Sequence, residues 1–279
     1  MAVPPDNARK NPPLPNDPLA PFKPDLLQHF PGKEALLREG KAYSQRRGRT
    51  SKAAVTCLGV AVAALWLADP AWQTTRLATR VGERSTWTLR DGSRIQLNTD
   101  SVMVVENHLR SRRIALERGE AMFTVSHSWR AFVVTAAGVE IRDIGTHFNV
   151  RRAHVDVDVA VMEGAVEIKA GASSARVARG QALAVHGGQL GPLVDVQPGA
   201  VAWAKGKLVL DGSPLRLVVA EMQRYRDAPI RLRDEHAGSL RLSGEYDIGG
   251  LEPLLDALPA VLPVRVARHA DGTVDIASR

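Results

Sequence analysis

The chain has 279 residues, 44% of them hydrophobic and 24% charged, and its net charge is +7 at pH 7. The basic excess is concentrated at the start: residues 1–52 hold ten Lys or Arg against five Asp or Glu, and the rest holds 27 against 25. A nucleic-acid-binding protein carries its positive charge as a patch on a folded domain, so we expect no nucleic-acid partner. The single cysteine, Cys57, excludes an intrachain disulfide and a cysteine metal site, and the eight histidines lack ligand spacing. Neither a metal nor another cofactor is expected.

The first segment, residues 1–52, is rich in proline and in basic residues. Nine of the seventeen prolines lie within residues 1–31, a density that opposes helix formation and favours an extended, disordered arm. One short helix is expected over residues 32–46, where a thin apolar face recurs at helical spacing. The segment is predicted to be either a docking peptide for a cytoplasmic partner or a stalk beside a membrane.

Residues 53–68 form an uncharged run, AAVTCLGVAVAALWLA, which follows a basic cluster. As a helix it is about 24 Å long, roughly 6 Å short of a bilayer's hydrocarbon core, and Lys52 and Trp66 can reach the two interfaces. A buried soluble helix does not explain the one-sided basic cluster, and a signal peptide would have a shorter leading segment. The run predicts a single transmembrane helix. The positive-inside rule then places residues 1–52 in the cytoplasm and residues 70–279 in the periplasm of a bacterium, with the helix in the inner membrane.

Between residues 80 and 197 the hydrophobic pattern has a period of two and is cut by Gly, Asp and Asn, which indicates short strands. Asp91-Gly92 is typical of a tight hairpin turn. The expected fold is all-β, either a sandwich or a solenoid-like stack, and a glycine before each of several strands favours the stack. Examples of the expected strands are 85–89, 93–98, 101–106, 113–117, 121–125, 131–135, 140–144, 147–150, 155–162 and 165–169.

Residues 203–279 indicate a compact α+β module of about 70 residues. Pro214 suits the first turn of a helix, where its missing N–H is not needed. The predicted order is β-α-β-β-α-β-β, with strands at 207–211, 229–232, 240–246, 264–266 and 274–276 and helices at about 214–225 and 251–258.

Several motifs in this order resemble one known family, the FecR-type transmembrane regulators of extracytoplasmic-function (ECF) sigma factors. They are LRDGSRIQLN (89–98), RGEAMFTV (118–125), AFVV (131–134), IGTHFNV (144–150) and VMEGAV (161–166). The C-terminal module, 203–279, is similar to the short N-terminal module of secretins and TonB-dependent transporters (STN). The resemblance therefore implies a periplasmic FecR-like β domain over 80–197, followed by an STN-like module.

The resemblance also implies partners and a role. Family members relay a signal from the signalling domain of a TonB-dependent outer-membrane transporter to a cytoplasmic ECF sigma factor, commonly for iron or haem uptake genes. For transporter contact we expect the second helix of the C-terminal module and the 240–246 strand. Several members break their own chain at the Gly-Thr bond of the GTxF motif, after which a site-2-type protease cuts within the membrane. On this sequence that bond is Gly145-Thr146.

The residues allow such a cleavage. The Thr146 hydroxyl could attack the Gly145 carbonyl and convert the amide into an ester, which water then hydrolyses. Glycine has no Cβ to block the approach, and His147 or Asp143 could move the proton. The alternative is that Gly145-Thr146 is only a turn before the next strand.

Two other functions stay open. Only 52 residues precede the apolar run, and none match a helical anti-sigma domain, so a membrane-anchored periplasmic scaffold that binds through β-augmentation is an alternative. A tethered hydrolase is the third possibility. Because no G-x-S-x-G or H-E-x-x-H motif and no carboxylate pair occurs, we expect no enzyme acting on an outside substrate.

Overall fold

The computed structural model describes residues 20–22, 24, 25 and 33–279, so the arm expected over residues 1–31 lies mostly outside the described residues. The chain divides into two compact units, Met1–Leu67 and Ala68–Arg279. In the first unit a short 3-10 helix, η1 (Ala20–Phe22), precedes the long helix α2 (Lys33–Ala68). The helix expected over 32–46 and the run 53–68 are thus parts of one helix, because no proline interrupts the sequence between them.

Several large apolar side chains in the second half of α2 are exposed. They are Val55, Leu58, Val60, Val62, Leu65, Trp66 and Leu67. Within the described part of the chain, no helix combines the length and mean hydropathy needed to cross a membrane. The run 53–68 is helical, as expected, but the membrane crossing is not confirmed and stays a prediction.

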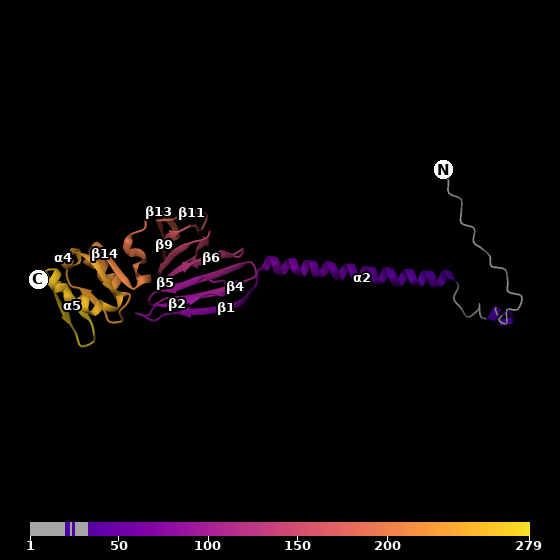
Figure 1. Cartoon of the computed structure of the whole chain (residues 1–279), viewed down its shortest axis with the longest axis horizontal. Helices are drawn as coiled ribbons and strands as arrows, with labels where there is room; N and C mark the ends of the chain where they lie inside the picture. Colours follow the sequence, from indigo (N-terminus) through magenta and orange to yellow (C-terminus); the bar gives the residue numbers. More distant parts are fainter. Residues whose placement is uncertain (1–19, 23, 26–32) are drawn as a thin grey trace. The chain divides into compact units, whose positions relative to one another are not determined.

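The second unit begins with a mainly β domain, which confirms the expected fold class (Figure 1). Its strands are β1 (Ala71–Ala78), β2 (Ser85–Thr88), β3 (Arg94–Leu97), β4 (Val102–His108), β5 (Ser111–Thr124), β6 (Ala131–Ala136), β7 (Val139–Asp143), β8 (His147–Ala153), β9 (Asp156–Glu163), β10 (Ala165–Ala170), β11 (Ser173–Ala178), β12 (Gln181–His186) and β13 (Gln189–Asp195). All of them belong to one 13-stranded sheet.

The long strand β5 shapes this sheet. Its first half pairs with β4 and β6, and its second half pairs with β3 and β8. Gly119, at the change of partners, has a φ of +87°. The strands at the two ends of the sheet order, β11 and β13, lie against each other, so the sheet wraps around one core. The structure thus confirms a mainly β domain built on one large sheet.

The C-terminal module contains eight elements and a 3-10 turn. They are β14 (Lys207–Pro214), α3 (Leu215–Gln223), β15 (Ile230–Leu232), α4 (Glu235–Ser239), β16 (Arg241–Asp247), η3 (Ile248–Gly250), α5 (Leu251–Val261), β17 (Val264–Arg268) and β18 (Val274–Ser278). Strands β14 and β16 form one small sheet, and β15, β18 and β17 form another. A 3-10 helix, η2 (Pro198–Lys205), connects the module to the β domain.

The β domain and the C-terminal module each have a hydrophobic core of their own. Side chains of the β domain also pack in the core of the module. Met122 lies on β5, yet it packs in the core of the module with Trp203, Leu215 and Met222. Met162 of β9 also packs against that core. The β domain therefore supplies part of the apolar surface that packs in the core of the module.

Candidate functional site

The predicted bond Gly145-Thr146 lies in the turn between β7 and β8. Gly145 has a φ of +85°, a conformation that glycine adopts readily and other residues rarely do. Asp143 holds the turn from both sides, because one carboxylate oxygen accepts the Gly145 N–H at 3.0 Å and the other accepts the Thr146 hydroxyl. Thr146 is buried, with 5% of its surface exposed, whereas Gly145 is exposed to solvent.

Gly164 fixes the turn from the opposite side. A Cβ at this position would lie 2.2 Å from the Gly145 carbonyl oxygen and 2.8 Å from the Thr146 methyl group. The backbone of Gly164, between β9 and β10, therefore lies in close contact with the Gly145-Thr146 peptide. Only glycine can occupy position 164, because any Cβ there would clash with that peptide. The recurring glycine before a strand, seen in the sequence, has here the physical role of close backbone contact.

His147 does not contact the Thr146 hydroxyl. Its Nδ1 lies 3.2 Å from the Thr124 hydroxyl and its Nε2 lies 2.7 Å from the Met122 sulfur. Burial lowers the pKa of His147, and the nearby Glu163 opposes this only in part. Of the two residues considered for proton transfer, Asp143 is the one placed on the hydroxyl, as a general base acting on a nucleophile must be.

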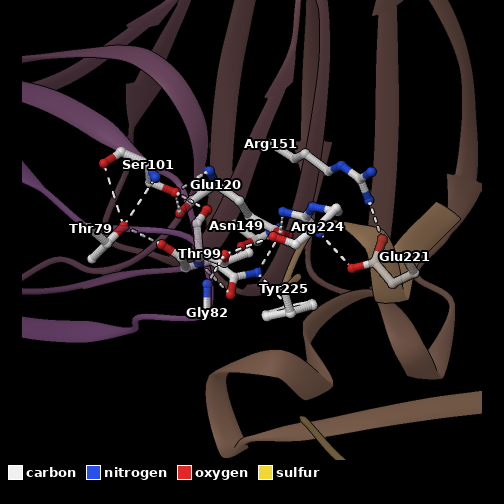
Figure 2. Close-up of polar contacts among 11 residues, drawn as sticks. Thr79, Gly82, Thr99, Ser101, Glu120, Asn149, Arg151, Glu221, Arg224 and Tyr225 are labelled. Atoms are coloured by element: carbon white, nitrogen blue, oxygen red, sulfur yellow. Dashed lines mark hydrogen bonds and ion pairs between the residues drawn. The ribbon is translucent and has the colours of Figure 1, made fainter. Parts of the chain in front are cut away.

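A second cluster, which the sequence did not predict, joins the β domain to the C-terminal module. We call it the module interface; its residues are Asn98, Thr99, Glu120, Asn149, Arg151, Glu221, Arg224 and Tyr225 (Figure 2). Glu120 is its centre and is only 2% exposed. Its carboxylate accepts hydrogen bonds from Asn98 at 2.8 Å, from Asn149 at 2.8 Å and from Arg224 at 2.6 Å.

Arg224 follows α3 and carries the charge that compensates Glu120. Its guanidinium also contacts Glu221 at 2.5 Å, and Glu221 accepts a further bond from Arg151 of β8 at 3.1 Å. Burial alone would lower the pKa of Arg224, but Glu120 and Glu221 raise it above its usual value. The alternating chain of two arginines and two glutamates therefore pairs the buried charge of Glu120 and the partly buried charges around it.

Backbone and phenol groups complete the module interface. Thr99 donates its hydroxyl to the Arg224 carbonyl oxygen at 2.8 Å and accepts the Gly82 N–H at 2.8 Å. Asn98 donates to the Tyr225 hydroxyl at 2.9 Å. Burial raises the pKa of Tyr225 to about 12, although Arg224 acts in the opposite direction. The phenol stays neutral because the charged form would lose hydration.

Sequence signals existed for only half of the module interface. Asn98, Thr99, Glu120 and Asn149 lie in the LRDGSRIQLN, RGEAMFTV and IGTHFNV segments or directly beside them, so their segments were recognised but not their roles. Nothing in the sequence marks Arg224 as their partner. Among the described residues, no group of three or more His, Cys, Asp or Glu side chains is arranged to hold a metal ion.

Comparison with known protein families matches part of the β domain. The family model described as FecR protein matches residues 75–167, a range that includes Glu120 and the Gly145-Thr146 turn. The chain carries a FecR domain. The matched range starts inside β1 and ends inside β10, so the FecR domain contains most of the strands that wrap the core.

Solved structures resemble about three quarters of the chain. Two crystal structures of a candidate anti-sigma factor from Parabacteroides distasonis ATCC 8503, at 2.50 and 1.65 Å resolution, each have a TM-score of 0.62 to this chain. They are 23% and 24% identical to it, cover 74% of this chain, and are themselves covered over 100% and 99% of their length. At this identity the likeness establishes a shared fold. No curated protein matches the chain.

Proposed function

We propose that this FecR-domain protein is a membrane-anchored regulator that relays a signal from the periplasm to a cytoplasmic ECF sigma factor. The observation that carries the proposal is the FecR domain itself, joined through the module interface to an α+β module and preceded by an apolar helix. The candidate anti-sigma factor with the same fold supports this reading.

The apolar half of α2 supports the anchor. Seven large apolar side chains between Val55 and Leu67 are exposed, and water solvates such a surface poorly. The basic cluster lies before this run and not after it, so residues 1–52 face the cytoplasm and the FecR domain faces the periplasm. Residues 1–52 then form the segment that binds the sigma factor.

The C-terminal module supplies the periplasmic docking surface. Within the described chain, β16 pairs with β14 along one edge, and no strand pairs with its other edge. An open edge offers backbone N–H and C=O groups to another strand. We propose that the signalling domain of a TonB-dependent transporter binds to this strand and to the adjacent α5. The signal that is relayed would then control iron or haem uptake genes.

The Gly145-Thr146 turn is proposed to break once per chain. Asp143 takes the hydroxyl proton while the Thr146 oxygen attacks the Gly145 carbonyl carbon; the C–N bond breaks and the Thr146 nitrogen takes up the proton. Water then hydrolyses the ester, which leaves a carboxylate at Gly145 and a free amine at Thr146. A site-2-type protease releases the cytoplasmic segment afterwards.

The test is an immunoblot of full-length chain with a C-terminal tag, expressed in Gram-negative cells that also carry a reporter gene under an ECF sigma factor. Wild type should give a fragment corresponding to residues 146–279, and Thr146→Ala should give only the full-length chain. Thr135→Ala, a threonine of β6 away from the turn, is the matched control and should cleave like wild type. Uncleaved chain in both wild type and control would contradict the cleavage.

The reporter separates the regulator from its alternative. Deleting residues 1–52 should change reporter expression if the chain binds a sigma factor. Unchanged expression would favour a membrane-anchored periplasmic scaffold without sigma-factor binding, for which the open edge of β16 is the specific observation.

A further inference from the structure

Two methionines of the β domain pack with the core of the C-terminal module. Met122 of β5 is buried within that core, and Met162 of β9 packs against it. Strand β8 lies between β5 and β9, and its Asn149, a residue of the module interface, pairs with Met122 (Figure 2). The two strands that flank β8 therefore each contribute an apolar side chain to the contact with the module.

The ends of the same two strands hold the Gly145-Thr146 peptide. Val125, three residues after Met122, donates its N–H to the Thr146 carbonyl oxygen at 3.0 Å. Gly164 follows Met162 by two residues, and a Cβ there would lie 2.2 Å from the Gly145 carbonyl oxygen. The carbonyl groups of residues 145 and 146 are thus each in contact with a segment that continues from one of the two methionines.

His147 links the module core to the turn directly. The sulfur of Met122 can only accept a hydrogen bond, so Nε2 of His147 carries a proton and donates it to the sulfur at 2.7 Å. Burial lowers the pKa of His147, so at neutral pH the ring is uncharged and its Nδ1 accepts the Thr124 hydroxyl at 3.2 Å. The residue that follows Thr146 is therefore held on β5 by a side chain that belongs to the module core.

Strand β9 has a bulge beside the turn. The register of β9 against β8 shifts between His147 and Phe148, which leaves Met162 as an extra residue without a partner on β8. A β-bulge redirects the side chain of the extra residue, and here that side chain packs against the module core. Because strand pairing does not hold Met162, its packing with the module fixes the bulge and, two residues later, the position of Gly164.

We propose that the C-terminal module, when docked on the β domain, positions the Gly145-Thr146 bond for cleavage, with Met122 and Met162 as positioning residues. This role rests on the self-cleavage proposed above. In that reaction the hydroxyl oxygen bonds to the carbonyl carbon, the C–N bond breaks, and the hydroxyl proton passes through Asp143 to the nitrogen. Negative charge develops on the carbonyl oxygen that Gly164 contacts. Because the attack requires close alignment of the reacting atoms, a small displacement of the turn slows it.

With this arrangement, cleavage follows the folding of the module. Synthesis reaches the module last, so the strands of the β domain are made before it. Until the module docks, the chain lacks the packing of both methionines and the pairing of Glu120 with Arg224. Its turn is then not held in place and the chain stays intact. Only a chain with a folded module, the part proposed to bind the periplasmic partner, is cut.

The experiment follows the cleavage rate of the full-length chain with a C-terminal tag, by pulse-chase labelling in Gram-negative cells. Met122→Ala and Met162→Ala should slow the appearance of the 146–279 fragment by roughly tenfold to a hundredfold, as expected for misplaced reacting groups. Met122→Leu and Met162→Leu keep the apolar volume and should cleave at the wild-type rate. Met103→Ala is the matched control, because it removes the same atoms from the core of the β domain. It should also cleave at close to the wild-type rate.

Arg224→Met tests the same link from the side of the module. The Arg224 guanidinium pairs with Glu120 and Glu221 and not with the turn, so it can affect cleavage only through docking. This substitution should slow cleavage as the two alanine variants do, whereas Arg118→Met, which removes a surface pair, should not. If an alanine variant does not fold, as judged by circular dichroism, the comparison of these two arginine variants decides.

The outcomes separate the role of the module from the cleavage itself. A wild-type chain that yields no fragment contradicts the self-cleavage and the positioning role together. Cleavage of the wild type with unchanged rates in Met122→Ala, Met162→Ala and Arg224→Met overturns only the positioning role. Equal slowing in Met103→Ala would also overturn it, because a general loss of stability would then control the rate.

Discussion

Arg224 carries the compensating charge for a glutamate that lies 104 residues earlier in the chain. Because Glu120 is almost fully buried, its carboxylate exchanges water for this guanidinium and for two amide donors. A buried ion pair adds little net stability over an apolar pair, but removing one member leaves an uncompensated charge. The module interface therefore determines which surface of the β domain meets the C-terminal module, and it adds little to the net free energy of unfolding.

Arg224→Met should lower the free energy of unfolding by about 3 kcal/mol, because Glu120 would stay buried without a cationic partner. Arg118→Met is the matched control: Arg118 pairs with Asp100 at 2.7 Å on the surface, and its loss should cost less than about 1 kcal/mol. Urea denaturation of the full chain in detergent, followed by circular dichroism, measures both. Equal losses for the two variants would contradict the role of Arg224.

Tyr225 should titrate with a pKa of about 12, above the ordinary value, because its phenol is buried. A pKa raised on folding means that the contribution of this group to stability is complete below pH 10 and is lost as the pH rises through about 12. Absorbance at the phenolate band should show a late step for one of the three tyrosines, which Tyr225→Phe removes. Three coincident steps near the ordinary value would show that the phenol is hydrated.

At the level of single elements, β5 differs most from expectation. The sequence predicted two strands, 113–117 and 121–125, because Arg118-Gly119 resembles a turn; the structure has one strand that bends at Gly119. A Cβ there would lie 2.2 Å from the Ser101 hydroxyl and 2.6 Å from its Cα. The glycine thus allows one strand to change partners and to wrap the sheet.

Gly119→Ala should therefore lower the free energy of unfolding of the FecR domain far more than an alanine substitution at a glycine that has a positive φ but no close neighbour. Gly180→Ala is the control, since Gly180 has a φ of +78° but no neighbour within 4 Å of a built Cβ. The control should cost about 1–2 kcal/mol, and Gly119→Ala should cost several times as much or prevent folding. Thermal unfolding of both variants compares them. Similar melting temperatures would mean that Ser101 moves aside without cost.

Among the elements that the sequence did not predict, two have simple explanations. β1 begins at Ala71, nine residues before the expected start of the β domain, because its side chains are largely exposed and do not alternate. α4 has only five residues, too few for a helical period, and it is capped by Asp234, which accepts the Ala237 N–H at 2.7 Å. The segments with two-fold alternation and a buried face, such as β9 and β10, were predicted well.

At the scale of the whole molecule, the FecR domain and the module share Met122 as well as the polar network. Met122→Ala should raise hydrogen exchange in α3 and α5, although the substitution lies on β5, because it removes packing from the module core. Met103→Ala, in the core of the FecR domain, should raise exchange in that domain's strands and leave α3 and α5 protected. Mass spectrometry of peptic peptides from the full chain distinguishes the two patterns. Unchanged exchange in α3 and α5 for Met122→Ala would show that the module is stable without this contact.

The sequence by itself determined the order of the parts: an apolar run after a basic segment, a strand-rich region with FecR motifs, and an α+β module. It also marked Gly145-Thr146, because local motifs and two-residue periodicity depend only on neighbours along the chain. Only the tertiary structure decided that Asp143 holds the Thr146 hydroxyl, that Gly164 presses on Gly145, and that Glu120 meets Arg224. These contacts depend on how β5 bends and on which surfaces then face each other. No local sequence pattern encodes these long-range contacts, because the residues involved are brought together only when both cores have formed.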